Sequence, residues 1–424
     1  ANGCQVVDRQ GDIAVVIIPR HRLRALAACA SVRRIEASRP CGLAMDTVPA
    51  VVRALDVYAG TRLPQAYTGR GVVVGVMDVG FDLTHPNFYD CMAHAYRVKA
   101  FWDQLSRDTV GSGMPVGRDY ADQASILSVQ HSVDGYIQTH GTHTLGTAAG
   151  SGWQSPYRGM AYESDLCLVS NAVSEDIALI DSADLYKYTS ATDALGFKYI
   201  FDYAEAHGLP CVASFSEGYR LRFDDDDRLY AEYLDRLTGP GRIIVASAGN
   251  ESVHRGYFSK PSGTASAGSY LYVNANTGEV SVSGRGHFTV SLMLYEGERA
   301  DTLTISPECC PLDSTVSVPF VTASGRKAVD VTVSRYLSAF DAGTTVLDVA
   351  LRGDTLLRAT AYPLAFTIQG SDAEAEARLV SSESVFINRD TPAPWTDATI
   401  FRNTLVPGCF PGVVTVGATV HRTG

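Results

Sequence analysis

The chain has 424 residues, of which 46% are hydrophobic and 19% charged, and this composition excludes global disorder and supports a sizeable core. Its formal net charge of −11 argues against nucleic acid as the main partner, because binding to phosphates requires a basic face. No apolar run approaches the ~18 residues that a membrane-spanning helix needs.

Residues 1–60 predict a small N-terminal unit. Residues 12–18 have the pattern of a strand, 20–29 that of a short amphipathic helix, and 32–37 that of a second strand. The resulting β-α-β unit is too small to be very stable alone.

Residues 61–258 alternate between strand and helix patterns. Continuous apolar runs at 72–77, 166–171, 211–215 and 243–247 predict parallel strands that are covered on both faces. Apolar residues recur at helical spacing over 194–204, and Gly208 and Pro210 end that helix. This part therefore predicts an α/β fold with a parallel sheet and flanking helices.

Residues 259–395, which we call the β insert, have a sequence pattern that strands and turns explain without any helix. Short alternating strands are predicted at 279–283, 287–295, 302–306, 329–333 and 344–351, separated by turn residues. A β-sandwich or jelly roll is the expected architecture. From 396 to 424 the α/β pattern resumes, with a buried strand at 413–418.

Three polar positions lie where chemistry is expected. Asp78 ends the strand 72–77, and ligands of parallel sheets bind beyond the carboxyl ends of strands. His140 begins a run of small residues suited to a closely packed helix, and Asn250 follows the strand 243–247. Taken singly, Asp78 and Asn250 could be turn residues and His143 a structural histidine.

The order of these segments resembles the subtilase family. The matching motifs are Val74-Gly75-Val76-Met77-Asp78-Val79-Gly80, His140-Gly141-Thr142-His143, Ser214-Phe215-Ser216-Glu217-Gly218, Ala248-Gly249-Asn250 and Phe410-Pro411-Gly412-Val413. The resemblance covers residues 62–258 and 396–424. The β insert is similar to the insert of a branch of the family that carries a jelly roll at this point. The N-terminal unit looks like part of a propeptide, which can stay docked on the protease domain; the alternative is that this unit is unrelated to a propeptide.

The resemblance implies a serine endopeptidase acting on polypeptides. His140 would be the general base, Asp78 would orient it, and Asn250 would donate to the oxyanion. Ser216 and Gly218 on one side, with Ser247 and Gly249 on the other, would pair with an extended substrate. A secreted or cell-envelope location is also implied.

The nucleophile of the family lies in a Gly-Thr-Ser-x-Ala-x-Pro motif after the strand matched by 413–418. We expect this serine beyond Gly424, so that these 424 residues alone are inactive. Residues 263–268 have the wrong order and no following proline, and Ser266 is not assigned.

Two other functional classes stay open. The protein could be an inactive pseudoprotease or peptide-binding module, or an unrelated enzyme with a metal at His140 and His143, although no HExxH pattern supports the latter. The nine cysteines are irregularly spaced, which disfavours a zinc site, and we expect Cys167 and Cys211 to be buried. No cofactor is expected. Calcium could bind the acidic run 224–227, although a solvated loop is favoured there. Asn87 stands where the family often has a carboxylate ligand, which weakens the case for calcium.

Overall fold

The structure is a computed structural model that describes residues 4–35, 48–134, 139–223, 226–273, 276–325, 327–338, 341–353, 363–381 and 384–418. It divides into two compact units, Ala1–Val48 and Pro49–Gly424. Residues 49–60, which the sequence pattern grouped with the N-terminal unit, therefore lie in the second unit.

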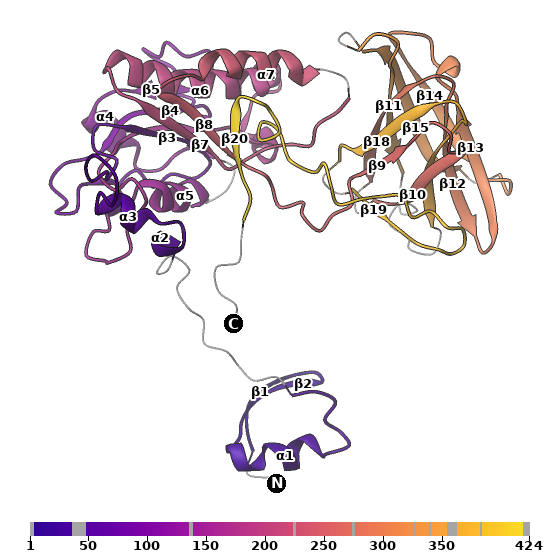
Figure 1. Cartoon of the computed structure of the whole chain (residues 1–424), viewed down its shortest axis with the longest axis horizontal. Helices are drawn as coiled ribbons and strands as arrows, with labels where there is room; N and C mark the ends of the chain where they lie inside the picture. Colours follow the sequence, from indigo (N-terminus) through magenta and orange to yellow (C-terminus); the bar gives the residue numbers. More distant parts are fainter. Residues whose placement is uncertain are drawn as a thin grey trace. The chain divides into compact units, whose positions relative to one another are not determined.

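The N-terminal unit is a hairpin followed by a short helix (Figure 1). Strand β1 (Gln5–Gln10) pairs antiparallel with β2 (Ile13–Ile17), and η1 (Arg20–Arg22) and α1 (Leu23–Ala27) follow. The predicted β-α-β order is wrong, because Gly11 at φ +57° starts a two-residue turn and reverses the chain. Residues 32–35 are not a strand, and residues 36 and 37 lie outside the described residues.

The second unit contains a seven-stranded sheet in the order β20-β8-β7-β3-β6-β4-β5 (Figure 1). Its pairs are parallel except for β4 with β5, which is antiparallel. The four strands predicted from apolar runs before the insert are present, and so is the one after it. The expectation that this last strand is buried is wrong, because β20 is an edge strand in which Val413 is buried but Val414 and Val416 are each 52% exposed. The bounds are β3 (Val73–Asp78), β4 (Val98–Asp103), β5 (Arg118–Tyr120), β6 (Asp165–Ser170), β7 (Cys211–Phe215), β8 (Arg242–Ser247) and β20 (Val413–Val416).

Helices cover both faces of this sheet, and the alternation of side chains along β3 shows which helix covers which face. Val73 and Met77 join the core beneath α6 (Ser190–Ala206) and α7 (Asp226–Leu237). Val74 and Val76 pack with α4 (Gln123–Val129) and α5 (His140–Ala149) on the other face (Figure 1). The remaining short helices are α2 (Val48–Val51), α3 (Ala54–Tyr58), η2 (Pro86–Phe88), η3 (Ser174–Leu179) and η4 (Leu185–Lys187).

Two glycines let α6 lie close to β3. A Cβ atom on Gly75 would lie 2.2 Å from Cγ2 of Ile200, and one on Gly196 would lie 2.3 Å from Sδ of Met77. A side chain on either residue would force strand and helix apart, so the sheet–helix distance is set by these positions. The cysteines Cys167 and Cys211 are buried at 0% and 1% exposure, as expected.

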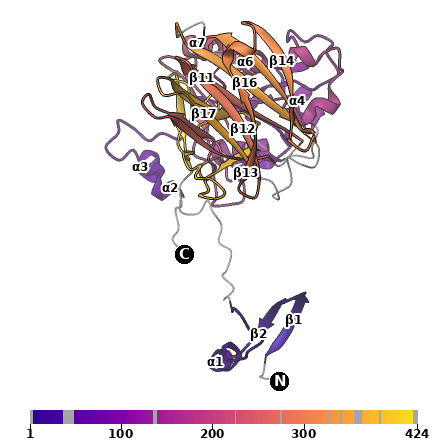
Figure 2. The ribbon, with the colours of Figure 1, turned by 90° about the vertical axis from the view of Figure 1, so that its right-hand side faces the viewer.

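The β insert lies in sequence between β8 and β20, which are neighbours in the sheet. It consists of two antiparallel sheets, ordered β13-β12-β17-β10-β19 and β14-β15-β16-β11-β18-β9, whose inner faces share one core (Figures 1 and 2). The strands are β9 (Tyr257–Lys260), β10 (Ser266–Val273), β11 (Thr277–Arg285), β12 (Thr289–Glu296), β13 (Arg299–Ile305), β14 (Ser314–Val321), β15 (Lys327–Leu337), β16 (Thr345–Arg352), β17 (Leu364–Gln369), β18 (Glu374–Leu379) and β19 (Ser384–Ile387), with η5 (Pro307–Cys309) after β13.

The first strand of the β insert, β9, begins at Tyr257, before the predicted bound of 259, and the chain segments that enter and leave the insert lie side by side. Tyr257 and Thr399 form an antiparallel bridge, and the Thr399 N–H donates to the Tyr257 carbonyl at 2.8 Å. Arg220 also reaches the insert, donating to the carbonyls of Ser381 (2.6 Å) and Ser384 (3.1 Å).

The acidic run 224–227 is not simply a solvated loop. Helix α7 begins at Asp226, so Asp227 lies in its first turn, where the positive end of the helix dipole favours an acidic residue. Residues 224 and 225 lie outside the described part of the chain.

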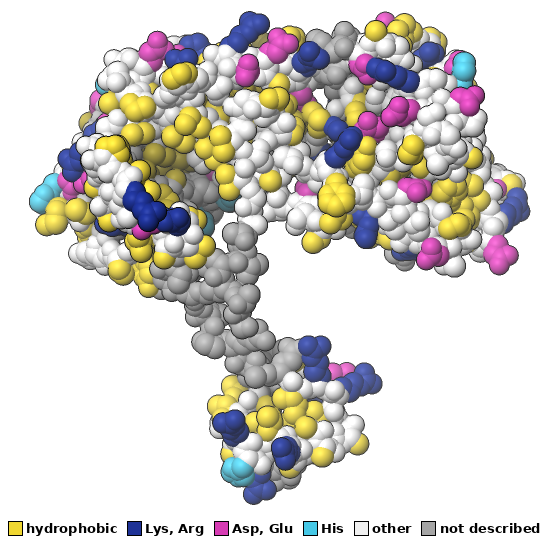
Figure 3. Space-filling view, viewed as in Figure 1, with side chains coloured by type: hydrophobic (Ala, Val, Ile, Leu, Met, Phe, Trp, Pro, Cys, Tyr) yellow, Lys and Arg dark blue, Asp and Glu magenta, His cyan; other side chains and the backbone are white. Residues whose placement is uncertain are grey.

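The surface mixes charges of both signs. Figure 3 shows Lys and Arg side chains interspersed with Asp and Glu over the viewed face. Among the helices that the structure describes, none combines the length and the apolar character needed to cross a membrane.

Candidate active site

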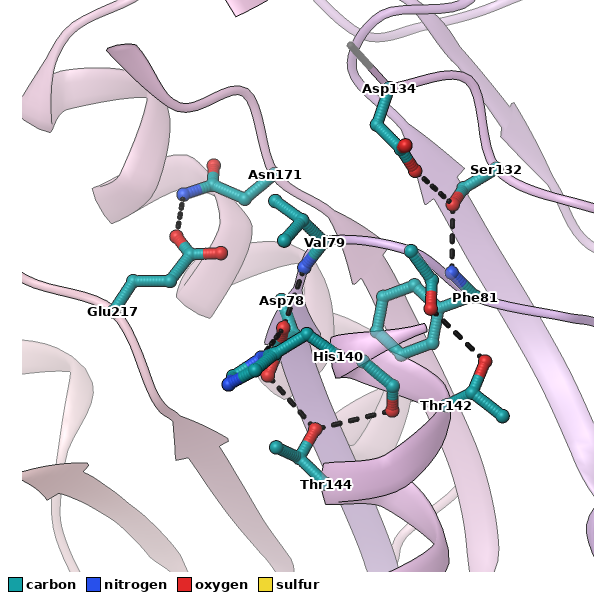
Figure 4. A network of polar contacts seen from close by, with 12 residues as sticks. Asp78, Val79, Phe81, Ser132, Asp134, His140, Thr142, Thr144, Asn171 and Glu217 are labelled. Carbon is teal, nitrogen blue, oxygen red and sulfur yellow. Dashed lines mark hydrogen bonds and ion pairs between the residues drawn. The ribbon is translucent and has the colours of Figure 1, made fainter. Parts of the chain in front are cut away.

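Asp78 is the last residue of β3, and its side chain is completely buried. Its Oδ1 lies 2.5 Å from Nδ1 of His140 and accepts from the Val79 N–H at 2.7 Å, while its Oδ2 accepts from the Thr144 hydroxyl at 2.9 Å (Figure 4). Three groups thus surround one buried carboxyl group. Such an acid can fix both the orientation and the tautomer of the imidazole beside it.

The start of α5 places His140 against Asp78. The first N–H groups of a helix have no acceptor within the helix. Here, carbonyl groups of the loop after β3 accept their hydrogen bonds. The Gly141 N–H donates to the Val79 carbonyl at 2.6 Å and the Thr142 N–H to the Gly80 carbonyl at 3.0 Å. A Cβ atom on Gly141 would lie 2.8 Å from the Phe81 ring, so glycine allows this close approach.

The two histidines of α5 differ in surroundings. His140 contacts Asp78 while its side chain keeps 47% exposure, which leaves the other ring nitrogen available to a reacting group. His143, one turn further along, is exposed. In the described residues, no cluster of three or more His, Cys, Asp or Glu side chains is arranged to hold a metal ion.

The positions proposed for substrate binding follow β7 and β8 at the same edge of the sheet. Met77 pairs with Phe215, and Phe215 with Ala246, so Asp78, Ser216 and Ser247 stand at one level across the sheet. Adjacent strands lie ~4.8 Å apart, which puts the ends of β3 and β8 about 10 Å from each other.

Gly218, Gly249 and Asn250 extend beyond these strand ends. Gly249 has φ +92°, a conformation that favours glycine, and Asn250 is exposed on the loop after β8. The structure therefore brings Asp78 and His140 into contact. It places Ser247 at the end of β8 and the other predicted residues on loops of the same sheet edge.

A second polar network lies beside Asp78. Asn171, directly after β6, donates to Oε2 of Glu217 at 2.6 Å (Figure 4). Asn171 also bonds Asp193 at the start of α6. Burial raises the pKa of Asp193 to about 7 and raises the pKa of Glu217 well above its ordinary range. Burial thus shifts both carboxyl groups towards the protonated form in the folded protein.

The side chain of Asn87 is used within the protein. Its Oδ1 accepts from the Trp153 N–H at 3.0 Å. The nearby cation is Arg97, which is buried and has a pKa lowered by burial to about 10. Its guanidinium donates to the backbone carbonyls of Asn87, Tyr89, Ser164 and Ala149.

Comparison with known proteins identifies the family and the fold of the chain. The sequence description of the subtilase family, the peptidase S8 class of serine proteases, matches residues 69–369, which is more than half of the chain. The chain belongs to the subtilase family. It has the subtilisin-like fold of that family, a largely parallel sheet between helices.

Individual relatives of this subtilase are distant. It is 35% identical over 102 residues to the subtilisin-like protease SBT2.1 of Arabidopsis thaliana, a match that covers 20% of this chain and 12% of the relative. The chain thus spans only about an eighth of that protein's length. The structure of the Clostridium perfringens CspB protease has a TM-score of 0.62 at 17% identity, covering 87% of this chain and 72% of the other. Sphericase has a TM-score of 0.30 at 22% identity, covering 47% and 52%.

The sequence analysis of this subtilase missed two parts of the site. Thr144 follows His140 by four residues on a helix, so the two side chains share a face, and this spacing could have revealed it. The Asn171, Glu217 and Asp193 network joins three separate elements, and the sequence carries no local signal for it.

Proposed function

We propose that the full-length protein is a serine endopeptidase in which His140 is the general base and Asp78 orients its imidazole. The nucleophile in this proposal is a serine that follows Gly424 in the chain. The observation that carries the proposal is the 2.5 Å contact between His140 Nδ1 and the buried Asp78 carboxyl group at the carboxyl edge of a parallel sheet.

In the proposed reaction, the serine hydroxyl attacks the scissile carbonyl and His140 accepts its proton. His140 then returns the proton to the leaving amine, while Asp78 stabilises the imidazolium and holds the correct tautomer. Asn250 donates to the oxyanion from the loop after β8. Removing such a donor from a subtilisin, the example from which the magnitude is taken, costs ~3 kcal/mol.

The substrate is a polypeptide bound in extended form. Ser216 and Gly218 pair with one side of its backbone, and Ser247 and Gly249 lie on the other. The support for this arrangement is the shared level of the ends of β7 and β8 next to Asp78.

The N-terminal unit is, in this proposal, a propeptide-like segment that docks on the protease part. Its hairpin supports the idea because it exposes the apolar side chains of Val6, Val7, Ile13 and Ile17, which lie on more than one face. The β insert is a jelly roll, and the protein acts outside the cytoplasm, in secreted or envelope-bound form, as subtilases commonly do.

Labelling with a fluorophosphonate probe tests the proposed activity, since only a serine activated by a working base reacts. We expect the full-length protein to label, and Asp78→Asn and His140→Ala to lower the labelling rate by about 10³-fold or more. His143→Ala, on the same helix but exposed, is the matched control and should label normally. A wild-type protein that does not label would instead support a pseudoprotease that only binds peptides.

A further inference from the structure

Leu405 lies between the two loops that are proposed to hold the substrate. A Cβ atom on Gly218 would lie 3.0 Å from the Leu405 Cβ, and one on Gly249 would lie 2.6 Å from its Cγ and 2.7 Å from its Cδ1. Gly218 follows β7 and Gly249 follows β8. The isobutyl group of Leu405 therefore fills the space next to both glycines.

The backbone around Leu405 is fixed to both loops. The Leu405 N–H donates to the Ala248 carbonyl at 3.2 Å, and the Val406 N–H donates to the Tyr219 carbonyl at 2.9 Å. Tyr219 and Val406 also form an antiparallel bridge, and Val406 is fully buried. Leu405 is thus held in place on both sides and is only partly exposed.

The position of Leu405 identifies the substrate residue that it would meet. In the proposed function Asn250 donates to the carbonyl under attack, and Gly249 is its neighbour in the chain. The side chain that enters beside Gly249 therefore belongs to the substrate residue on the amino side of the scissile bond.

We infer that Leu405 limits this pocket to small side chains, so that the protein cleaves after residues such as Ala or Ser and rejects Phe or Leu. The inference rests on the proposed function, and it names the substrate class of the same site. Without Leu405 the two glycines would border an open, apolar slot, because neither of them carries a side chain of its own.

The test compares the full-length wild type with Leu405→Gly and Leu405→Ala on peptide pairs that differ only in Ala or Phe before the scissile bond. We expect the wild type to prefer Ala. The ratio of kcat/KM for Phe over Ala should rise by about 10- to 100-fold in Leu405→Gly and by less in Leu405→Ala. Leu312→Ala, a half-exposed leucine of the β insert, is the matched control and should keep the wild-type ratio.

Calorimetric binding of product peptides that end in Ala or Phe gives a readout without catalysis. If Leu405→Gly binds the Phe peptide more tightly than the wild type does, with no such increase for the Ala peptide, the inference is supported even if fluorophosphonate labelling has refuted the proposed activity. The inference is overturned if Leu405→Gly and Leu405→Ala, both shown to be folded by their thermal unfolding, gain nothing for Phe over Ala, or if the wild type already prefers Phe.

Discussion

Replacing Thr144 by valine tests whether the hydroxyl on α5 contributes to the proposed catalysis through Asp78. The substitution nearly keeps the shape of the side chain but removes the 2.9 Å hydrogen bond to Oδ2 of the buried carboxyl group. A hydrogen bond to a charged group contributes about 1.5–3 kcal/mol. If the full amount acts on the transition state, kcat falls by about 10- to 150-fold.

The assay measures kcat and KM of full-length Thr144→Val and of Thr144→Ser, which keeps the hydroxyl. We expect kcat to fall in the valine variant with KM nearly unchanged, because Thr144 contacts Asp78 and Gly141, and the proposed substrate-binding residues lie on other loops. Urea unfolding of both variants measures any loss of stability separately. Equal kcat for valine and serine would refute the idea that this hydroxyl helps Asp78 to hold His140.

Two further predictions concern stability. Because burial raises the pKa of Asp193 from 3.8 to about 7, the folded protein holds an extra proton between those values. The free energy of unfolding should therefore fall as pH rises from about 4 to 7, by at most ~1.4 kcal/mol per unit from this group. Asp193→Asn should flatten the plot of unfolding free energy, measured in urea, against pH between about 4 and 7, whereas Asp202→Asn, at an exposed site, should not. Equal slopes for the wild type and Asp193→Asn would contradict the raised pKa of Asp193. Gly75→Ala should lower the free energy of unfolding by about 1–3 kcal/mol, because the added methyl group overpacks against α6. Gly113→Ala is the control and should change the free energy of unfolding little, because no atom lies within 4 Å of its added Cβ. A Gly75→Ala variant as stable as the wild type would contradict tight packing between β3 and α6.

The middle of the central sheet could be predicted from the sequence because its inner strands, such as β3 and β6, are buried on both faces. Runs such as 72–77 and 211–215 are almost continuously apolar, and this pattern leaves few alternatives to a parallel strand. The contact between Asp78 and His140 could be expected only from the order of the motifs. The two residues are 62 positions apart, and no local property of the chain between them fixes the distance between their side chains.

Other elements were missed for identifiable physical reasons. Strand β18 (Glu374–Leu379) is rich in Ala and Glu, which favour helix, and it forms a strand only because β9 and β11 pair with it. The N-terminal hairpin was missed because the turn at Gly11 was not recognised. Leu405 has no motif, and its role depends on contacts with residues more than 150 positions away in the sequence.

The bridge between Tyr257 and Thr399 has a consequence for how this chain could have been assembled. Two chain segments that already touch can be joined by a short turn or by a whole folded module. The two cases differ little in the entropy lost on closing the loop, because this loss grows only slowly with the number of residues in the loop. The protease scaffold can thus gain, lose or exchange the module at this junction while β8 and β20 stay neighbours.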